Sequence, residues 1–249
     1  MSLLDDVESI PRRTMHLFFL ADVSGSMRGA KIGAVNDAIR NVLPIVSEIS
    51  DNNPDAEIKI AALTFSDGTM WVYNEPKAAA DFEWIDQNAN GGTDLGEACI
   101  DLEQVLHKTE KGGWMSSGSG SFAPVFILLS DGGPTDDYLR GIEILRRNNW
   151  FKAGIKVAIA IGEDADYNVL EKFAGERVIR VHDIETLKKV IRVVVITSSQ
   201  VGSSSASAST SGKEVTKEDE VTEAIKQQLS QDNVEIGVDA SSYNPDEFD

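Results

Sequence analysis

The stretch that decides the fold reads Leu17-Phe-Phe-Leu-Ala-Asp22-Val-Ser24-Gly-Ser26-Met27. Five apolar residues run without alternation into a loop that carries one carboxylate and two hydroxyls. An unbroken apolar run is typical of a strand that is covered on both faces, as the central strands of a parallel α/β sheet are. The loop then lies at the carboxyl end of that strand, where open sheets of this kind bind their ligands.

The spacing of the polar residues in this loop indicates a metal site. Asp22, Ser24 and Ser26 lie two residues apart, so in an extended backbone their side chains project to the same side. Gly25 allows the chain to turn between the serines. A carboxylate and hydroxyls form a hard, all-oxygen ligand set that suits Mg²⁺, with Mn²⁺ or Ca²⁺ as alternatives. Three ligands are too few, so we expect the others to come from later loops.

Two later loops supply further ligands. Gly91-Gly92-Thr93-Asp94 contributes a threonine, and Ser130-Asp131-Gly132-Gly133 contributes an aspartate directly after a second apolar run, Val125-Phe-Ile-Leu-Leu129. The predicted metal site therefore comprises Asp22, Ser24, Ser26, Thr93 and Asp131. The alternative is that the hydroxyls only cap helices and satisfy loop amides. That alternative does not explain two aspartates placed at strand ends on one edge.

These five residues stand in an order that resembles the metal-ion-dependent adhesion site (MIDAS) of von Willebrand factor A (VWA) domains. The wider match is similar to bacterial tellurium-resistance VWA proteins of the TerY type and covers roughly residues 12 to 197. It includes Thr64-Phe-Ser-Asp67, Gly-Gly-Thr-Asp-Leu-Gly-Glu-Ala at 91–98 and Ser-Asp-Gly-Gly-Pro-Thr-Asp-Asp at 130–137. Five positions in order, each in a plausible loop, are far more specific than a lone Asp-x-Ser-x-Ser.

The resemblance implies a role for each residue. In VWA domains the serines contact the metal directly, the threonine contacts it directly or through water, and the aspartates act largely through water. Few direct anionic ligands leave a coordination position open, which an acidic side chain of a partner protein fills. The resemblance therefore implies a non-enzymatic, metal-dependent protein-interaction module in a bacterial stress or tellurium-resistance system. Such systems are associated with a protein kinase and a phosphatase, so that pair is an expected partner.

Enzyme classes fit the sequence less well. A phosphatase with an aspartyl nucleophile also uses Mg²⁺, but it needs a second aspartate two residues after the first, where this chain has Ser24. The loop misses the phosphate-loop spacing, and the chain has no Gly-x-Ser-x-Gly elbow. His16, His107 and His182 lie far apart and form no zinc signature with a single cysteine. We therefore expect no enzyme, and a Mg²⁺-dependent phosphatase-like hydrolase is the less favoured alternative.

The remaining pattern predicts a doubly wound α/β fold with a mostly parallel central sheet, one antiparallel edge strand and helices on both faces. We expect strands at 15–21, 57–65, 69–73, 125–129, 155–161 and 178–181, and helices at 30–49, 95–108, 134–147, 167–173 and 184–196. The Asp67-Gly68 turn indicates the antiparallel hairpin. Pro44 predicts a kink or an early end of the first helix.

Two details concern the later helices. The helix at 134–147 is expected to carry acids in its first turn, where they suit the helix dipole, and Leu139 on its buried face. Cys99 stands beside the apolar face of the helix at 95–108, and we interpret it as a small core residue rather than a nucleophile.

Four segments follow from composition. We expect a lead-in at 1–14, the VWA domain at 15–197, a Ser/Thr-rich flexible linker at 198–215, and an acidic tail at 216–249. The tail contains a short helix pattern to about Gln231 with a thin apolar stripe of Val221, Ile225 and Leu229. It docks on the domain, docks on a partner, or stays solvated. The hydroxyls of the linker and tail are also candidate phosphorylation sites, so a phosphorylation-regulated adaptor is a second functional hypothesis.

The charge excludes one class of partner. The net charge is −18, of which residues 201–249 hold −8, with three lysines and eleven acidic residues. Nucleic acid is therefore not an expected partner, because phosphates repel such a chain. Cys99 is the only cysteine, so no internal disulfide forms, and the sequence has no membrane-length apolar run or secretory segment. We expect no membrane partner and a cytoplasmic location.

Overall fold

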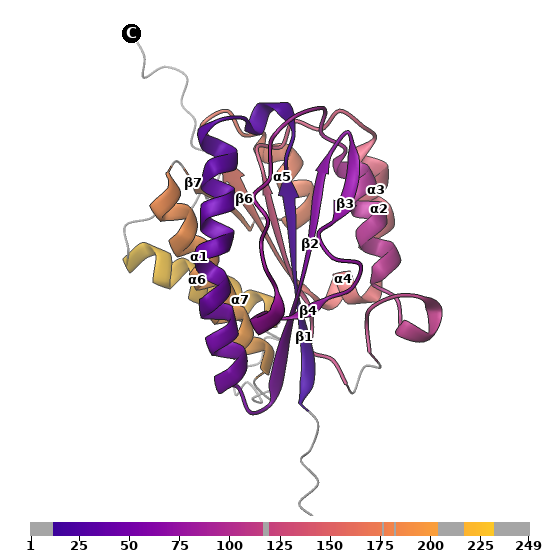
Figure 1. The fold of residues 1–249 in the computed structure, drawn as a ribbon, viewed down its shortest axis with the longest axis vertical. Coiled ribbons are helices and arrows are strands. Elements are labelled where there is room, and N and C mark those ends of the chain that lie inside the picture. Colours follow the sequence, from indigo (N-terminus) through magenta and orange to yellow (C-terminus); the bar gives the residue numbers. More distant parts are fainter. Residues whose placement is uncertain (1–11, 117–119, 176, 182, 204–216, 232–249) are drawn as a thin grey trace, which may run out of the picture.

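A central sheet organises the molecule in the computed structural model, which describes residues 12–116, 120–175, 177–181, 183–203 and 217–231 (Figure 1). The strand order is β3-β2-β1-β5-β6-β7, and β4 pairs with β2 off this path. The strands are β1 Arg13–Asp22, β2 Ala56–Ser66, β3 Gly68–Trp71, β4 Lys77–Ala78, β5 Val125–Ser130, β6 Ile155–Ile161 and β7 Val178–Val181. The pairs β1–β2, β1–β5, β5–β6 and β6–β7 are parallel, while β3 and β4 run antiparallel to β2. The predicted α/β class is thus confirmed, with β4 as an additional short strand that the sequence did not predict.

Strand β1 lies at the point where the winding direction reverses. The chain passes from β1 to β2 on one side and later returns to β5 on the other side of β1. In the register, Asp22 is opposite Phe65 of β2, and Ala21 is opposite Leu129 of β5. The ends of these three strands therefore lie next to one another at one edge, which is where open α/β sheets bind ligands.

Helices cover both faces of the sheet (Figure 1). One layer contains α1 Ala30–Asn52, α6 Ile184–Ser203 and α7 Lys217–Gln231, and the other contains α2 Leu95–Val105, α3 Tyr138–Arg147, α4 Asn149–Ala153 and α5 Tyr167–Ala174. The unbroken apolar run of β1 is buried on both sides. Leu17 and Phe19 belong to the core under the first layer, and Phe18 and Leu20 belong to the core under the second. The alternation of side chains along a strand explains this division.

Several boundaries differ from the prediction in the first half of the chain. Strand β1 begins at Arg13, so Arg13 and Thr14 are sheet residues although we assigned them to the lead-in; residues 1–11 lie outside the described residues. Helix α1 does not end early at Pro44 but continues to Asn52. The buried side chains of Val42, Leu43 and Val46 hold both sides of the proline against the core and offset its missing N–H bond.

Helices α2 and α3 are shorter than predicted. Helix α2 ends at Val105 rather than Lys108, because the amide of Trp114 returns to bond the Val105 carbonyl at 2.8 Å. Helix α3 begins at Tyr138 instead of Pro134, and Asp137 caps it by accepting a hydrogen bond from the Arg140 amide. Its first turn therefore holds no acid, and Leu139 is 53% exposed rather than buried. Helix α4 was not predicted.

Two helices, α6 and α7, occupy part of the predicted linker and tail. Helix α6 extends to Ser203, so residues 198–203 are helical, while 204–215 of the predicted linker lie outside the described residues. Helix α7 docks on the domain through Val221, Ile225 and Leu229, which join the core of the first layer. The tail beyond Gln231 also lies outside the described residues. None of the helices in the described ranges combines the length and the apolar character that crossing a bilayer requires.

Candidate metal centre

The predicted site residues come from three loops at the carboxyl edge of the sheet. Asp22 is the last residue of β1, and Asp131 follows the last residue of the neighbouring strand β5. Ser24 has an extended backbone (φ −68°, ψ 171°) and immediately precedes the short 3-10 helix η1 Gly25–Met27. The first and third loops therefore start on adjacent strands, and the sheet register fixes their separation.

Four of the five predicted residues form one contiguous network of hydrogen bonds. Asp22 Oδ1 accepts a bond from the Ser24 amide at 2.8 Å, and the hydroxyls of Ser24 and Ser26 lie 3.0 Å apart. Ser26 Oγ donates to Asp131 Oδ1 at 3.0 Å. The network also includes Ser130, whose hydroxyl donates to Asp22 Oδ2 at 2.6 Å and accepts from the Gly132 amide at 2.8 Å. We did not predict Ser130; its position directly before Asp131 at a strand end is the signal that could have identified it.

Thr93 is held against the other two loops by backbone contacts. The Gly25 amide donates to the Gly91 carbonyl at 3.0 Å, which joins the Thr93 loop to the serine loop. On its other side, the Thr135 amide donates to the Thr93 carbonyl at 2.9 Å, and the Thr93 amide donates to Thr135 Oγ1 at 2.8 Å. The structure thus brings the loops of all five residues together.

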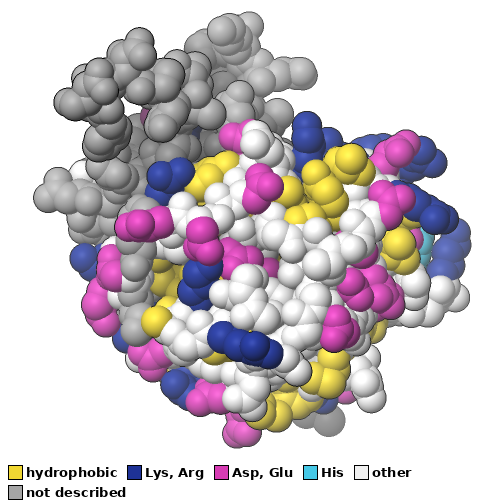
Figure 2. Space-filling view, turned by 90° about the horizontal axis from the view of Figure 1, so that it is seen from above, with side chains coloured by type: hydrophobic (Ala, Val, Ile, Leu, Met, Phe, Trp, Pro, Cys, Tyr) yellow, Lys and Arg dark blue, Asp and Glu magenta, His cyan; other side chains and the backbone are white. Residues whose placement is uncertain are grey.

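The site reaches solvent at Ser26. Asp22, Ser24, Thr93 and Asp131 are buried, whereas Ser26 is exposed. Figure 2 looks onto this edge and shows acidic side chains over the same face. A ligand that approaches from solvent therefore meets the Ser26 hydroxyl first, with the carboxylates beneath it.

The burial and the negative charge of Asp22 and Asp131 favour a bound cation. Burial raises the pKa of Asp22 above its usual value, and the nearby Asp131 carboxylate adds to the rise, while hydrogen bonds from Ser130 and Ser24 oppose it. A divalent cation would relieve this desolvation and repulsion, and its preferred ligands are the hard oxygens present here. The residues therefore fit a metal ion of the Mg²⁺ type. No group of three or more His, Cys, Asp and Glu side chains within the described residues is arranged to hold a metal, so the hydroxyls are essential to this donor set.

Comparison with known proteins decides the family. The model of the von Willebrand factor type A domain matches residues 16–193. The chain belongs to the VWA domain family. Domains of this family are metal-dependent protein-interaction modules built on a MIDAS motif.

Two similar proteins are heavy chains of the inter-alpha-trypsin inhibitor. The chain is 27% identical over 184 residues to inter-alpha-trypsin inhibitor heavy chain H4 of Bos taurus and 25% identical to heavy chain H2 of Homo sapiens. In both cases the match spans 69% of this chain but only 18% of the relative.

Solved structures share the fold. A von Willebrand factor type A protein from Catenulispora acidiphila has a TM-score of 0.56 at 20% identity, over 75% of this chain and 43% of the other. Proximal thread matrix protein 1 of the mussel byssus, with a zinc-occupied MIDAS motif, has a TM-score of 0.57 at 17% identity, over 74% and 48% of the two chains.

Three further aspartates brace the loops of this VWA domain. Asp67 Oδ1 accepts from the Gly92 amide at 2.6 Å, and Asp94 Oδ2 accepts from the Gly68 amide at 2.7 Å. Asp136 accepts from the Gly96 and Glu97 amides at 3.0 and 2.9 Å, close to the start of α2. Gly91 has a φ of +80°, and a Cβ there would lie 2.5 Å from Asp67 Oδ2. Only glycine therefore fits next to the Asp67 side chain at this position.

Among the described residues, Cys99, His16 and His107 lie away from this edge. Cys99 is fully buried in the core under α2, and burial raises the pKa of its thiol. His16 lies inside β1, and burial lowers its pKa to about 4, with a smaller contribution from Lys59. His107 stands beyond the end of α2, and His182 lies outside the described residues.

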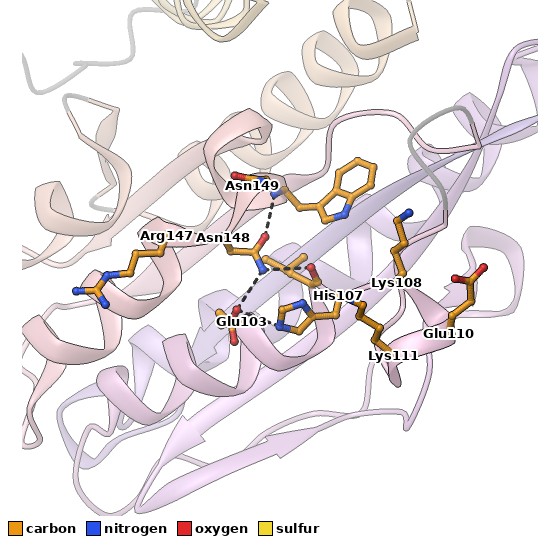
Figure 3. A pocket seen from close by; sticks show the side chains of 10 residues that line it. Glu103, His107, Lys108, Glu110, Lys111, Arg147, Asn148 and Asn149 are labelled. Atoms are coloured by element: carbon orange, nitrogen blue, oxygen red, sulfur yellow. Dashed lines mark hydrogen bonds and ion pairs between the residues drawn. The ribbon is translucent and has the colours of Figure 1, made fainter.

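Away from this site, a hollow lies between the end of α2 and the start of α4 (Figure 3). Its volume is about 490 Å³. Asn148 holds its wall together: its Oδ1 caps α4, and its Nδ2 donates to the Leu106 carbonyl at 3.1 Å and to Glu103 at 3.3 Å. His107 Nε2 lies 3.1 Å from the same Glu103 carboxylate. Asn148, Glu103 and His107 therefore bond one another and not a ligand, unlike the five predicted ligands at the carboxyl edge of the sheet, which we call the metal edge.

Proposed function

We propose that this chain is a non-enzymatic interaction module that binds a protein partner through a divalent cation. The cation is held by Asp22, Ser24, Ser26, Thr93 and Asp131, and it accepts an acidic side chain of the partner. The observation that carries the proposal is the contiguous network from Asp22 through both serines to Asp131, which is buried at one end and open at Ser26.

The aspartates and the serines of the site have different roles. The buried aspartates supply negative charge beneath the site, and the serine hydroxyls supply neutral oxygen ligands at its open end. A bound cation supplies a Lewis-acidic position for a carboxylate. Neutral ligands leave more of the cation's charge available to the partner, and the all-oxygen set favours Mg²⁺, with Mn²⁺ and Ca²⁺ as alternatives.

The test is partner capture from the native host with the full-length chain in the presence of Mg²⁺ or EDTA. We expect partners that are retained only with Mg²⁺, and loss of those partners in Asp22→Ala. Circular dichroism shows whether the variant keeps its fold. Capture that is the same in both buffers and in a folded Asp22→Ala protein would contradict the proposal.

The biological setting stays a prediction. A bacterial stress or tellurium-resistance role, a kinase and phosphatase as partners, and a cytoplasmic location all depend on the sequence resemblance or on composition. The alternative of a phosphorylation-regulated adaptor concerns hydroxyls that largely lie outside the described residues. Mass spectrometry of the native protein tests it, and a tail without phosphate would remove it.

A further inference from the structure

Lys31 in the first turn of α1 connects the metal edge to a fourth loop. Its ammonium nitrogen lies 2.9 Å from Asp131 Oδ2 and 2.7 Å from Asp164 Oδ1, in the loop that follows β6. The side chain of Asp131 is only 4% exposed, that of Lys31 is 20% exposed, and that of Asp164 is 72% exposed. Within the described residues, no other basic side chain forms an ion pair with either aspartate of the predicted site.

This contact determines which oxygen of Asp131 faces the serines. Lys31 occupies Oδ2, and Oδ1 accepts the hydrogen bond from Ser26 at 3.0 Å. Lys31 therefore fixes the orientation of the carboxylate. It also places one positive charge beside a predicted ligand of the cation, in a partly buried position where screening by solvent is weaker than at the surface.

We infer that Lys31 is a positioning residue that lowers the affinity of the site for its cation and raises the affinity of the cation-bound site for a partner carboxylate. The inference rests on the proposed metal site and names a determinant of its strength. Repulsion between the ammonium and the cation weakens metal binding. The same positive charge attracts an incoming carboxylate, so metal affinity and partner affinity depend on Lys31 in opposite directions.

Titration calorimetry of the full chain with Mn²⁺, and separately with Mg²⁺, tests the inference. We expect Lys31→Met to bind the cation about tenfold more tightly. One nearby charge commonly shifts a proton-binding equilibrium by about tenfold or more, and the same repulsion acts on a bound cation. Lys31→Arg keeps the charge and should stay within about threefold of the wild type. A residue that only supports the fold would show the opposite sign, because its loss loosens the site and weakens binding.

Two further variants test whether the effect on cation binding depends on the position of the removed charge. Arg28→Met removes the same charge from the loop just before α1, but Arg28 contacts the Ala89 carbonyl and the Asn90 side chain instead of Asp131, so we expect a change of less than about twofold. Asp164→Asn leaves Lys31 balanced by Asp131 alone and should weaken cation binding by about threefold. The double variant Lys31→Met with Asp164→Asn should return towards the wild-type affinity.

The outcomes test the metal site and the role of Lys31 separately. A wild-type chain that binds neither cation would contradict the proposed metal site and, with it, the role of Lys31. A wild-type chain that binds, together with a folded Lys31→Met protein whose affinity is unchanged or weaker, would overturn only the role of Lys31. Thermal unfolding without metal shows whether each variant is folded under the conditions of the titration.

Discussion

At the residue scale, the Ser130 side chain supports Asp22 from the end of the strand that leads to Asp131. Its hydroxyl is fully buried, donates to Asp22 and accepts from the Gly132 amide. Ser130 directly precedes Asp131 in the sequence, so the end of β5 positions both carboxylates. The sequence shows the serine, but only the parallel pairing of β1 with β5 shows that it faces Asp22.

Ser130→Ala should therefore weaken both the fold and the site. The buried Asp22 Oδ2 would lose its hydrogen bond, at a cost of about 1–3 kcal/mol in the free energy of unfolding. Loss of a supporting hydrogen bond of this kind weakens metal binding by about 10–100-fold. Urea denaturation and Mn²⁺ titration measure the two effects. Ser121→Ala is the matched control, because the Ser121 hydroxyl is buried without a hydrogen-bond partner and its loss should cost little.

His16 gives the molecule a pH-dependent stability that is independent of the metal. Burial lowers its pKa from 6.5 to about 4 in the folded chain. The unfolded chain therefore binds a proton more readily, and stability falls as the pH drops from about 6.5 to about 4. The loss reaches about 3 kcal/mol. His16→Phe keeps a ring in place of the one that stacks on Phe18 and should flatten this part of the profile; an unchanged slope would show that other groups cause it.

At the element scale, α7 is part of the domain rather than an appended tail. Three apolar side chains one turn apart are buried against the same core as α1 and α6. A helix with so thin an apolar stripe is marginal alone, and its burial provides the stabilisation that its own sequence lacks. The position of α7 on the face of α6 follows from packing between two helices that thirteen residues, 204–216, separate in the sequence.

Leu229→Ala should destabilise the domain by about 2–4 kcal/mol, because it removes a fully buried side chain from a packed core. Gln228→Ala changes the neighbouring exposed residue and should alter stability by less than about 0.5 kcal/mol. Urea denaturation of the full chain measures both. Equal stabilities for the two variants would mean that α7 is solvated and contributes nothing to the fold.

At the scale of the whole molecule, four loops lie next to one another at the metal edge. The loops after β1, β5 and β6 and the loop before α2 are joined by hydrogen bonds or ion pairs, while the sheet below them is covered on both faces. A cation at this edge would therefore stabilise the folded chain as a whole and have no equivalent site in the unfolded chain.

Mg²⁺ should raise the midpoint of thermal unfolding of the full chain, and EDTA should reverse the rise. At a Mg²⁺ concentration one hundred times its dissociation constant, the stabilisation is about 2.7 kcal/mol. Asp22→Ala should abolish the shift. A midpoint that does not respond to Mg²⁺, Mn²⁺ or Ca²⁺ would contradict a cation site at this edge.

The sequence by itself determined the fold class and the chemistry of the site residues. An apolar run of strand length, helical periodicity and oxygen-bearing side chains at two-residue spacing are local patterns, and local physics interprets them. The errors arose where local patterns were insufficient: they could not show that α1 continues past Pro44 instead of ending early, or that Leu139 faces solvent once α3 starts at Tyr138.

Only the tertiary structure decided which distant residues meet. Ser26 and Lys31 both contact Asp131, which lies 105 and 100 residues further along the chain, and Ser130 reaches Asp22 across 108. These contacts depend on the order of strands in the sheet and on the helices that pack against it. Periodicity along a chain carries no information about either, because many arrangements bury the same apolar faces, and the sum of long-range packing selects one of them.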